Sequence, residues 1–131
     1  MGYVLGIDIG TSGCKVTALD ASGRAAGTVS REWFPVVRTD GTSEQDPGEW
    51  LDGVRHAIRE LSSAVTGPFV VDAVGVTGQM QGATLVDESG APVRPSLLWN
   101  DTRTSAQTRE VLAHGRERIE RIIGAPFSDG L

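Results

Sequence analysis

Residues 6–15 contain the side chains best suited to chemistry, and they read Gly-Ile-Asp-Ile-Gly-Thr-Ser-Gly-Cys-Lys. The centre of this segment is a turn with two hydroxyl groups, those of Thr11 and Ser12, and Lys15 follows closely. A chain reversal with free N–H groups, hydroxyls and a nearby cation has the donors that bind phosphate. Asp8 adds a carboxylate suited to a hydrated Mg²⁺, because this hard cation prefers oxygen ligands. The segment therefore predicts a phosphate and metal site, and an ordinary hairpin is the open alternative.

Two common nucleotide-binding motifs are excluded by the same segment. A Walker A loop needs Gly-Lys-Ser/Thr at the start of a helix, but here a strand pattern follows the turn. A dinucleotide fingerprint needs Gly-x-Gly-x-x-Gly, which the segment lacks. Any phosphate site in this part of the chain would therefore be built on a hairpin.

A second polar group follows an apolar run at residues 69–76, which predicts a strand buried on both faces as in a parallel sheet. The polar residues are Gln79 and Gln81. Sheets of α/β proteins bind ligands beyond the carboxyl ends of their strands. Amide side chains there can both donate hydrogen bonds to ligand hydroxyls and accept them. A solvated loop is the alternative interpretation of these two residues.

The strands that would position Asp8 and the turn are indicated by side chains that alternate in polarity. Residues 3–9 and 14–19 each alternate with a period of two, which predicts an antiparallel hairpin. Asp8 falls on the same face of its strand as Gly6 and Gly10. Since glycine has no side chain, the space above the carboxylate should be open to a ligand or metal.

A helix is expected after the strands, because Asp46 is suited to be its N-cap, Pro47 its first residue and Glu49 its third. An apolar stripe with helical spacing follows: Trp50, Val54, Ile58, Leu61 and Val65. The other expected elements are strands at 25–34, 69–76 and 83–86, a polar loop at 39–45, and helices at 102–113 and 116–123. This order predicts an α/β fold in which three antiparallel strands lead into a mixed sheet with flanking helices.

Length and composition limit the class of protein. A chain of 131 residues has room for one domain. Its net charge of −5 argues against nucleic acid or an anionic membrane as the main partner. The single cysteine, Cys14, allows no intramolecular disulfide, and we expect it to be a small core residue. There is no apolar run long enough to span a membrane and no basic leader before Asp8, so we expect a cytoplasmic protein.

The hairpin segment resembles the first phosphate motif of the sugar kinase, Hsp70 and actin superfamily. Residues 75–83, Gly-Val-Thr-Gly-Gln-Met-Gln-Gly-Ala, and 97–103, Leu-Leu-Trp-Asn-Asp-Thr-Arg, resemble the FGGY carbohydrate kinases, nearest their xylulokinase-like branch. Residues 43–47, Ser-Glu-Gln-Asp-Pro, also fit that branch. Blocks in matching order over nearly the whole chain are more specific than one loop. The resemblance implies that residues 1–131 are the N-terminal part of the first kinase domain, with a partial actin-like, ribonuclease H-like fold.

The resemblance also implies roles for individual residues. Asp8 matches the acidic residue that organises Mg²⁺ and the phosphates. The hairpin positions that approach the phosphates of ATP are Thr11, Ser12, Gly13 and Lys15. The positions on the side of the sugar are Met80 and Gln81, with Gln79 beside them, and Trp99 and Asp101. The implied cofactors are ATP and Mg²⁺, and the implied substrate is a small sugar such as xylulose or a related pentulose or polyol.

The chain departs from the family pattern in two ways. Gln81 stands where the xylulokinase-like branch usually has histidine, so the preference for a pentulose is open. The family's catalytic aspartate, adenine pocket and second domain would lie further along, so we expect the 131 residues alone to show no kinase turnover. The alternatives are a non-catalytic sugar- or nucleotide-binding module, a truncated remnant, and another ATPase of the superfamily. A homo-oligomer is compatible with each of them.

Overall fold

The computed structural model describes residues 2–128, and the chain divides into two compact units. Unit 1 consists of the residues up to Phe34 together with Asp46–Gln79. Unit 2 consists of Pro35–Gln45 together with the residues from Met80 onward. Each unit is described by itself below.

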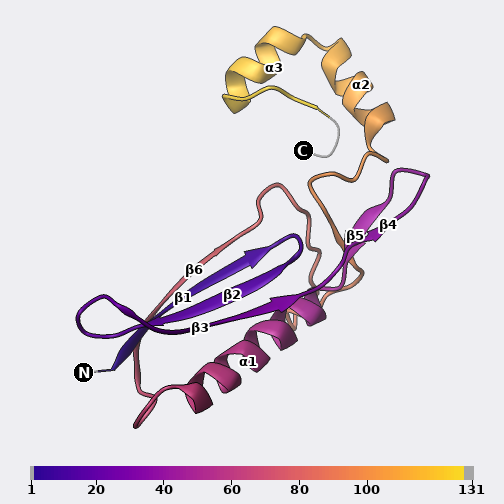
Figure 1. Ribbon diagram of the computed structural model, residues 1–131. Helices are drawn as coiled ribbons and strands as arrows, with labels where there is room; N and C mark the ends of the chain where they lie inside the picture. Colours follow the sequence, from indigo (N-terminus) through magenta and orange to yellow (C-terminus); the bar gives the residue numbers. More distant parts are fainter. Residues whose placement is uncertain (1, 129–131) are drawn as a thin grey trace. The chain divides into compact units, whose positions relative to one another are not determined.

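Unit 1 contains a four-stranded mixed sheet with the strand order β3-β2-β1-β6 (Figure 1). Its strands are β1 (Tyr3–Gly10), β2 (Gly13–Leu19), β3 (Ala25–Glu32) and β6 (Val71–Gly78). The first three strands are antiparallel, as predicted, and β6 pairs parallel with β1. The register places Asp8 opposite Lys15 and Gly10 opposite Gly13, so the hairpin turn is tight.

Helix α1 (Pro47–Ala64) covers one face of β2 and β3. It begins as predicted, because the side chain of Asp46 accepts a hydrogen bond from the backbone N–H of Gly48 at 2.8 Å. The core of unit 1 lies between this helix and the sheet, and its buried residues are Leu5, Ile7, Cys14, Val16, Ala18, Val29, Trp33, Ala57 and Leu61. The predicted apolar stripe of the helix packs against this core, and the prediction that Cys14 is a core residue is confirmed.

Strand β6 is exposed along its whole length, so the prediction of a strand buried on both faces was wrong. Helix α1 packs on β2 and β3, and β6 forms an edge of the sheet in the described part of the chain. An apolar run shows that a strand is suited to burial, but it does not show that another layer covers it. The strand also starts two residues later than predicted, and Phe69 instead stacks on the ring of Tyr3 with the centroids 5.5 Å apart.

Unit 2 contains a small antiparallel sheet with the order β4-β5-β7. Its strands are β4 (Val36–Val37), β5 (Ser43–Gln45) and β7 (Ser96–Leu97). The loop predicted at 39–45 was therefore wrong for its last three residues, where Ser43 and Gln45 are buried although they are polar. The strand predicted at 83–86 is reduced to two isolated bridges, Ala83 with Leu97 and Val86 with Pro92.

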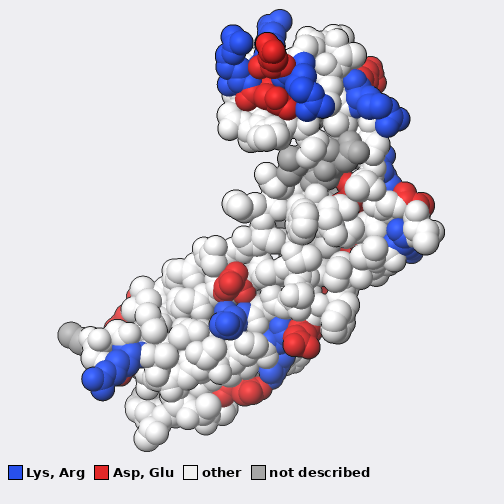
Figure 2. Space-filling model, turned by 45° about the horizontal axis from the view of Figure 1, so that its top comes forward, with Lys and Arg blue, Asp and Glu red and all other residues white. Residues whose placement is uncertain are grey.

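The last part of unit 2 consists of helices α2 (Ser105–Ala113) and α3 (Arg116–Ile123). Gly115 separates them with a φ of 113°, and Gly124 ends α3 in the left-handed conformation that favours glycine. On the face shown in Figure 2, acidic and basic side chains are interspersed over these helices. No helix within residues 2–128 is both long and apolar enough to cross a membrane.

Candidate functional site

Asp8 lies on the face of the sheet opposite helix α1, in a hollow of about 430 Å³. The hollow is lined by residues of three strands: Gly6, Ile7, Asp8, Lys15, Thr17, Gly75, Val76 and Thr77. A Cβ atom added to Gly6 would meet nothing within 4 Å, as predicted, whereas one added to Gly10 would lie 3.4 Å from the carbonyl oxygen of Gly13. Gly75, which was not predicted, leaves open space as well. Asp8 pairs in register with Lys15 on one side and with Thr77 on the other. A carboxylate, an ammonium and a hydroxyl therefore share one row across the sheet.

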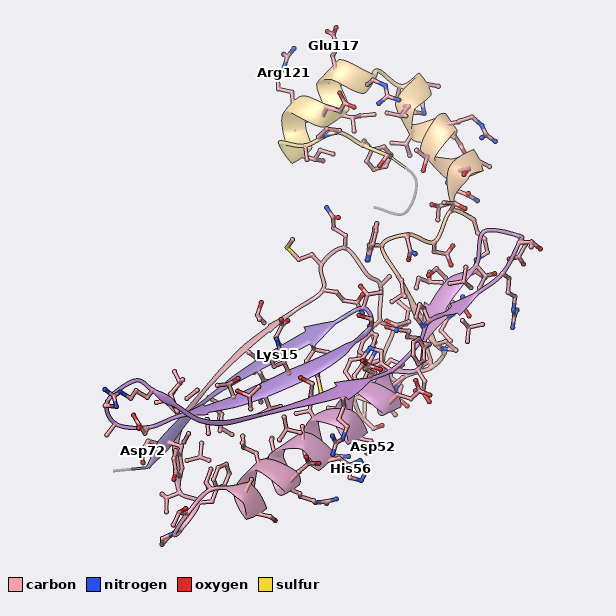
Figure 3. All side chains as sticks on the ribbon, viewed as in Figure 1. Lys15, Asp52, His56, Asp72, Glu117 and Arg121 are labelled. Atoms are coloured by element: carbon pink, nitrogen blue, oxygen red, sulfur yellow. The ribbon has the colours of Figure 1, made fainter. Side chains whose placement is uncertain are left out.

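A second hollow of about 400 Å³ adjoins the hairpin turn and shares Asp8 and Lys15 with the first. Ser12 and Gly13 line it as well, together with Ser30 and Glu32 of β3. Asp8 and Lys15 are exposed, and within residues 2–128 neither makes an ion pair. Both charges are therefore accessible to a ligand. Figure 3 labels Lys15 on the sheet.

Residues from other elements hold the hairpin turn in place. The Nε1–H of Trp33 donates to the carbonyl of Gly10 at 3.2 Å, and its backbone N–H donates to the carbonyl of Ser12 at 3.1 Å. The Thr11 hydroxyl donates to Oε1 of Gln79 at 2.8 Å, and the backbone N–H of Gln79 donates to the carbonyl of Ile9 at 2.8 Å. Two predicted site residues, Thr11 and Gln79, are thus brought into contact across 68 positions of sequence.

Gly13 is required by a close approach of the backbone. A Cβ atom at this position would lie 2.2 Å from the carbonyl oxygen of Arg31 on strand β3. Any side chain would therefore push β2 and β3 apart beside the turn. This packing role is additional to the phosphate contact that the resemblance implies for Gly13.

The open face fits a hydrated Mg²⁺ that is held mainly by phosphate oxygens. Asp8 provides one carboxylate, and no group of three or more histidine, cysteine, aspartate or glutamate side chains that could hold a metal occurs in residues 2–128. Mg²⁺ keeps several waters and typically takes one or two carboxylates together with substrate phosphates. Asp8 would hold such an ion through water, and Lys15 would contact the phosphates as a point charge.

Unit 2 contains the other predicted site residues, in two segments that lie side by side. The backbone N–H of Ala83 donates to the carbonyl of Leu97 at 2.8 Å, and the N–H of Leu97 donates to the carbonyl of Ala83 at 3.0 Å. This bridge places the turn that contains Gln81 beside the segment that contains Trp99. Met80 and Trp99 are exposed, at 77% and 46%. Unit 2 thus brings together three of the residues predicted to line the sugar site.

Gln81 has a φ of +62°, the one positive φ of a non-glycine residue within residues 2–128. The left-handed conformation costs about 1–2 kcal/mol for a residue with a Cβ. Strained backbone of this kind clusters at ligand sites, where the direction of the side chain matters. This observation supports the predicted position of Gln81 at a binding site, and the sequence alone did not contain it.

Asp101 is buried, with 4% of its surface exposed. Its Oδ2 accepts a hydrogen bond from the backbone N–H of Ser43 at 2.9 Å, and its Oδ1 accepts one from the backbone N–H of Arg103 at 3.1 Å. The Arg103 guanidinium also contacts both oxygens. These hydrogen bonds, above all those from the Arg103 side chain, lower the pKa of Asp101 to about 2. The carboxylate is therefore occupied inside unit 2, and a contact with sugar stays a prediction.

Asp101→Asn is expected to reduce the acid sensitivity of the protein. The pKa of Asp101 in the folded state, about 2, lies below its ordinary value of 3.8, so the carboxylate stabilises the fold above pH 3.8. That contribution is lost as the pH falls through about 2. Thermal unfolding followed by circular dichroism above pH 3.8 and near pH 2 should show a larger fall in melting temperature for the wild type than for Asp101→Asn. Equal falls in melting temperature would contradict the lowered pKa of Asp101.

The sequence interpretation assigned no site role to three residues that contact predicted site residues or their neighbours: Trp33 in unit 1, and Glu44 and Arg103 in unit 2. Trp33 fell only within the strand expected at 25–34, yet it holds the hairpin turn through Gly10 and Ser12. Glu44 and Arg103 were noticed only as parts of matching segments, yet they form ion pairs beside Asp101. The available signal was the presence of opposite charges in two of the family-like segments, 43–47 and 97–103.

Comparisons with known proteins point to one family. The model of the "FGGY family of carbohydrate kinases, N-terminal domain" matches residues 3–130. The chain is 41% identical over 109 residues to the xylulose kinase of Staphylococcus epidermidis, covering 82% of this chain and 22% of that protein.

Solved structures of similar proteins have the same fold. A crystal structure of a "xyloylose kinase" from Brucella ovis superposes with a TM-score of 0.89 at 35% identity, over 98% of this chain and 27% of that one. Plasmodium falciparum glycerol kinase with ADP superposes with a TM-score of 0.80 at 23% identity, over 92% of this chain and 25% of that one. The chain spans about a quarter of the length of these proteins, and its fold is that of the actin-like sugar kinases.

Proposed function

The chain belongs to the FGGY family of carbohydrate kinases, and from that premise we propose that its full-length protein phosphorylates a ketopentose or a related polyol. The γ-phosphoryl group of MgATP would pass to a sugar hydroxyl oxygen as the bond to the bridging oxygen of ADP breaks. We propose that residues 1–131 are the N-terminal part of the first kinase domain and supply the phosphate-facing hairpin and one wall of the sugar site. The proton acceptor is not assigned to this chain.

The observation that best supports the proposal is that Asp8 and Lys15 lie opposite each other on an open face of the sheet. Glycines line this face, and other residues hold the adjacent hairpin turn in place. Phosphoryl transfer depends on positioning and on neutralising charge rather than on covalent catalysis by the protein. MgATP, when bound, supplies the phosphoryl group and the electrophilic metal. Asp8 would orient the hydrated metal, and Lys15 would offset negative charge on the phosphates. The hairpin would bring the backbone of Ser12 and Gly13 and the hydroxyls of Thr11 and Ser12 to the same phosphates.

The substrate class rests on the relatives and on the chemistry of unit 2. Xylulose kinases are prominent among the similar proteins. An exposed indole such as that of Trp99 can pack against the apolar face of a sugar, and the Gln81 amide can both donate to hydroxyls and accept from them. We therefore favour xylulose or a similar ketopentose, with the glutamine at position 81 adjusting the choice.

Coupled ADP-release assays of the full-length protein test the function. Xylulose, ribulose, other ketopentoses, glycerol and ribitol would each be supplied with saturating MgATP. We expect turnover that depends on one of these sugars or polyols and on Mg²⁺. No sugar-dependent ADP release with any of them would overturn the proposal and favour the alternative of a binding module without catalysis.

Variants of Gln81 should separate its contact with the sugar from its strained backbone. Gln81→Ala is expected to lower kcat/KM by about 5- to 150-fold, because a sugar hydroxyl loses its polar partner. Gln81→Gly should lose the same activity but match or exceed the thermal stability of Gln81→Ala, because glycine adopts a φ of +62° without strain.

Gln81→His should shift the preference among ketopentoses and polyols. The measurement is kcat/KM across the sugar panel, together with the melting temperature of each variant. Identical substrate profiles for the wild type and the three variants would show that Gln81 is only a loop residue.

The cytoplasmic location, the oligomeric state and the lack of turnover by residues 1–131 alone stay predictions.

A further inference from the structure

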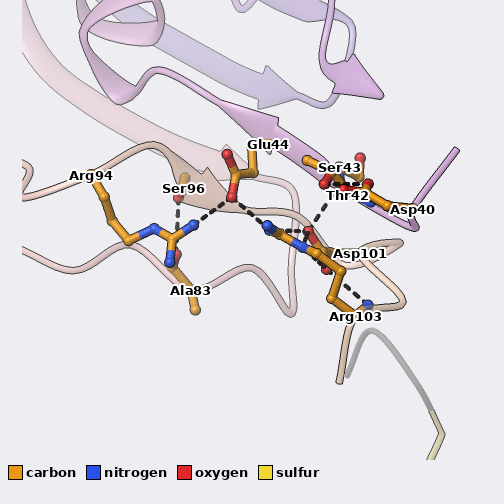
Figure 4. Close-up of polar contacts among 9 residues, drawn as sticks. All are labelled: Asp40, Thr42, Ser43, Glu44, Ala83, Arg94, Ser96, Asp101 and Arg103. Carbon is orange, nitrogen blue, oxygen red and sulfur yellow. Dashed lines mark hydrogen bonds and ion pairs between the residues drawn. The ribbon is translucent and has the colours of Figure 1, made fainter. Parts of the chain in front are cut away.

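Four charged side chains of unit 2 form a connected ion network, the Glu44 network, which consists of Glu44, Arg94, Asp101 and Arg103 (Figure 4). One oxygen of Glu44, Oε1, accepts hydrogen bonds from Arg94 Nη2 and Arg103 Nη2, both at 2.5 Å. The same Nη2 of Arg103 also donates to Oδ2 of Asp101 at 2.6 Å, and Nε of Arg103 donates to both oxygens of that carboxylate. The two carboxylates balance the two guanidinium groups, so the network is neutral as a whole.

The carboxylates are shielded from water, whereas the guanidinium groups are more open. The exposed fractions are 15% and 5% for the side chains of Glu44 and Asp101, and 44% and 35% for those of Arg94 and Arg103. Charge-assisted hydrogen bonds to a shielded carboxylate are stronger than those of an exposed surface pair. Replacing Glu44 by a neutral residue would leave two cations with one anion.

The Glu44 network attaches residues 95–102 to strand β5 at both ends of that segment. Arg94 lies before strand β7 and Arg103 lies after it, so Glu44 on β5 is joined to both sides of residues 95–102. Backbone hydrogen bonds connect the same segment to the same strand, from Leu98 N–H to the Ser43 carbonyl at 3.0 Å. Trp99 lies in the middle of this segment, next to the buried Leu98.

We propose that Glu44 is a positioning residue for sugar binding, which acts through Arg94 and Arg103 to set where the Trp99 ring lies beside the Met80–Gln81 turn. The inference rests on the proposed function, because it concerns the sugar that the kinase accepts. Glu44 itself would not contact the sugar. It fixes the segment that the bridge between Ala83 and Leu97 holds against the turn with Gln81.

The test uses the full-length kinase with Glu44→Gln, which keeps the length of the side chain and removes its charge. We expect the KM for the preferred sugar to rise about 5- to 20-fold, while kcat and the KM for ATP stay within about twofold. Arg94→Ala, which removes one of the two attachments, should raise the sugar KM by less. The matched control is Glu60→Gln, which breaks the ion pair of Glu60 with Arg31 in unit 1 and should leave all three constants unchanged.

Fluorine NMR of protein labelled with 5-fluorotryptophan gives a readout that does not depend on activity. Trp99→Phe assigns the Trp99 resonance, and the same substitution at Trp33 and Trp50 assigns theirs. Glu44→Gln should shift or broaden the Trp99 resonance while those of Trp33 and Trp50 keep their positions. An active wild type combined with an unchanged sugar KM and an unchanged Trp99 resonance in Glu44→Gln would overturn the inference. So would a variant that loses kcat and ATP affinity as strongly as sugar affinity. A wild type without sugar-dependent turnover would overturn the proposed function instead, and the Trp99 resonance would still test the positioning.

Discussion

Asp8→Asn in the full-length kinase is expected to lower kcat by about 10²- to 10³-fold, the loss typical when one preorganised electrostatic group is removed from an active site. Asparagine has nearly the same shape as aspartate but lacks the negative charge that would orient a hydrated Mg²⁺. Asp8 is exposed on the face opposite the core, so the fold should tolerate the change. Single-turnover and steady-state assays with a sugar and MgATP measure the effect, and circular dichroism checks the fold.

Asp52→Asn is the matched control for this experiment. Asp52 is an exposed carboxylate on α1 (Figure 3). It makes an exposed ion pair with Arg55 at 3.3 Å. Exposed pairs of this kind contribute about 0.2–1 kcal/mol at most, so activity and stability should stay near those of the wild type. If Asp8→Asn kept near-normal activity, or failed to fold, the role given to Asp8 would be incorrect.

Trp33→Ala should lower the free energy of unfolding by about 3–5 kcal/mol, as is usual when a large buried aromatic side chain is truncated. Trp33 is 6% exposed, and its ring lies against Gly53 of α1, where an added Cβ atom would come within 2.7 Å of it. The loss would be a large part of the 5–15 kcal/mol that stabilises a typical domain. Because the same indole holds the carbonyl of Gly10, the affinity for ATP should fall with the stability.

Trp33→Phe separates the two contributions of this side chain. Phenylalanine keeps most of the apolar contact with Gly53 and loses the hydrogen bond to Gly10, which contributes about 0.5–1.5 kcal/mol. Urea unfolding followed by far-ultraviolet circular dichroism compares the two variants with the wild type. Equal and small effects of alanine and phenylalanine would show that Trp33 neither fills the core nor supports the turn.

The local features of unit 1 could be predicted because each depends on residues close together in sequence. Alternating polarity predicted the hairpin of the first two strands and the open space beside Asp8 at Gly6, and both are confirmed. The start of α1 was predicted because an N-cap depends only on Asp46 and the first turn after it. The prediction for β6 failed in its burial, because burial depends on which layer covers a strand and not on the composition of the strand.

The contacts of the candidate site residues within each unit were decided by the tertiary structure. Thr11 meets Gln79 across 68 positions, and Ser43 meets Asp101 across 58. The backbone conformation of Gln81 and the double attachment of Glu44 to two arginines are likewise invisible in residue types. Residue identity determines which groups can donate, accept or carry charge, and near neighbours determine helix caps and strand alternation. The partner of each group depends on strand register and on distances across the fold, which arise only when the whole chain packs.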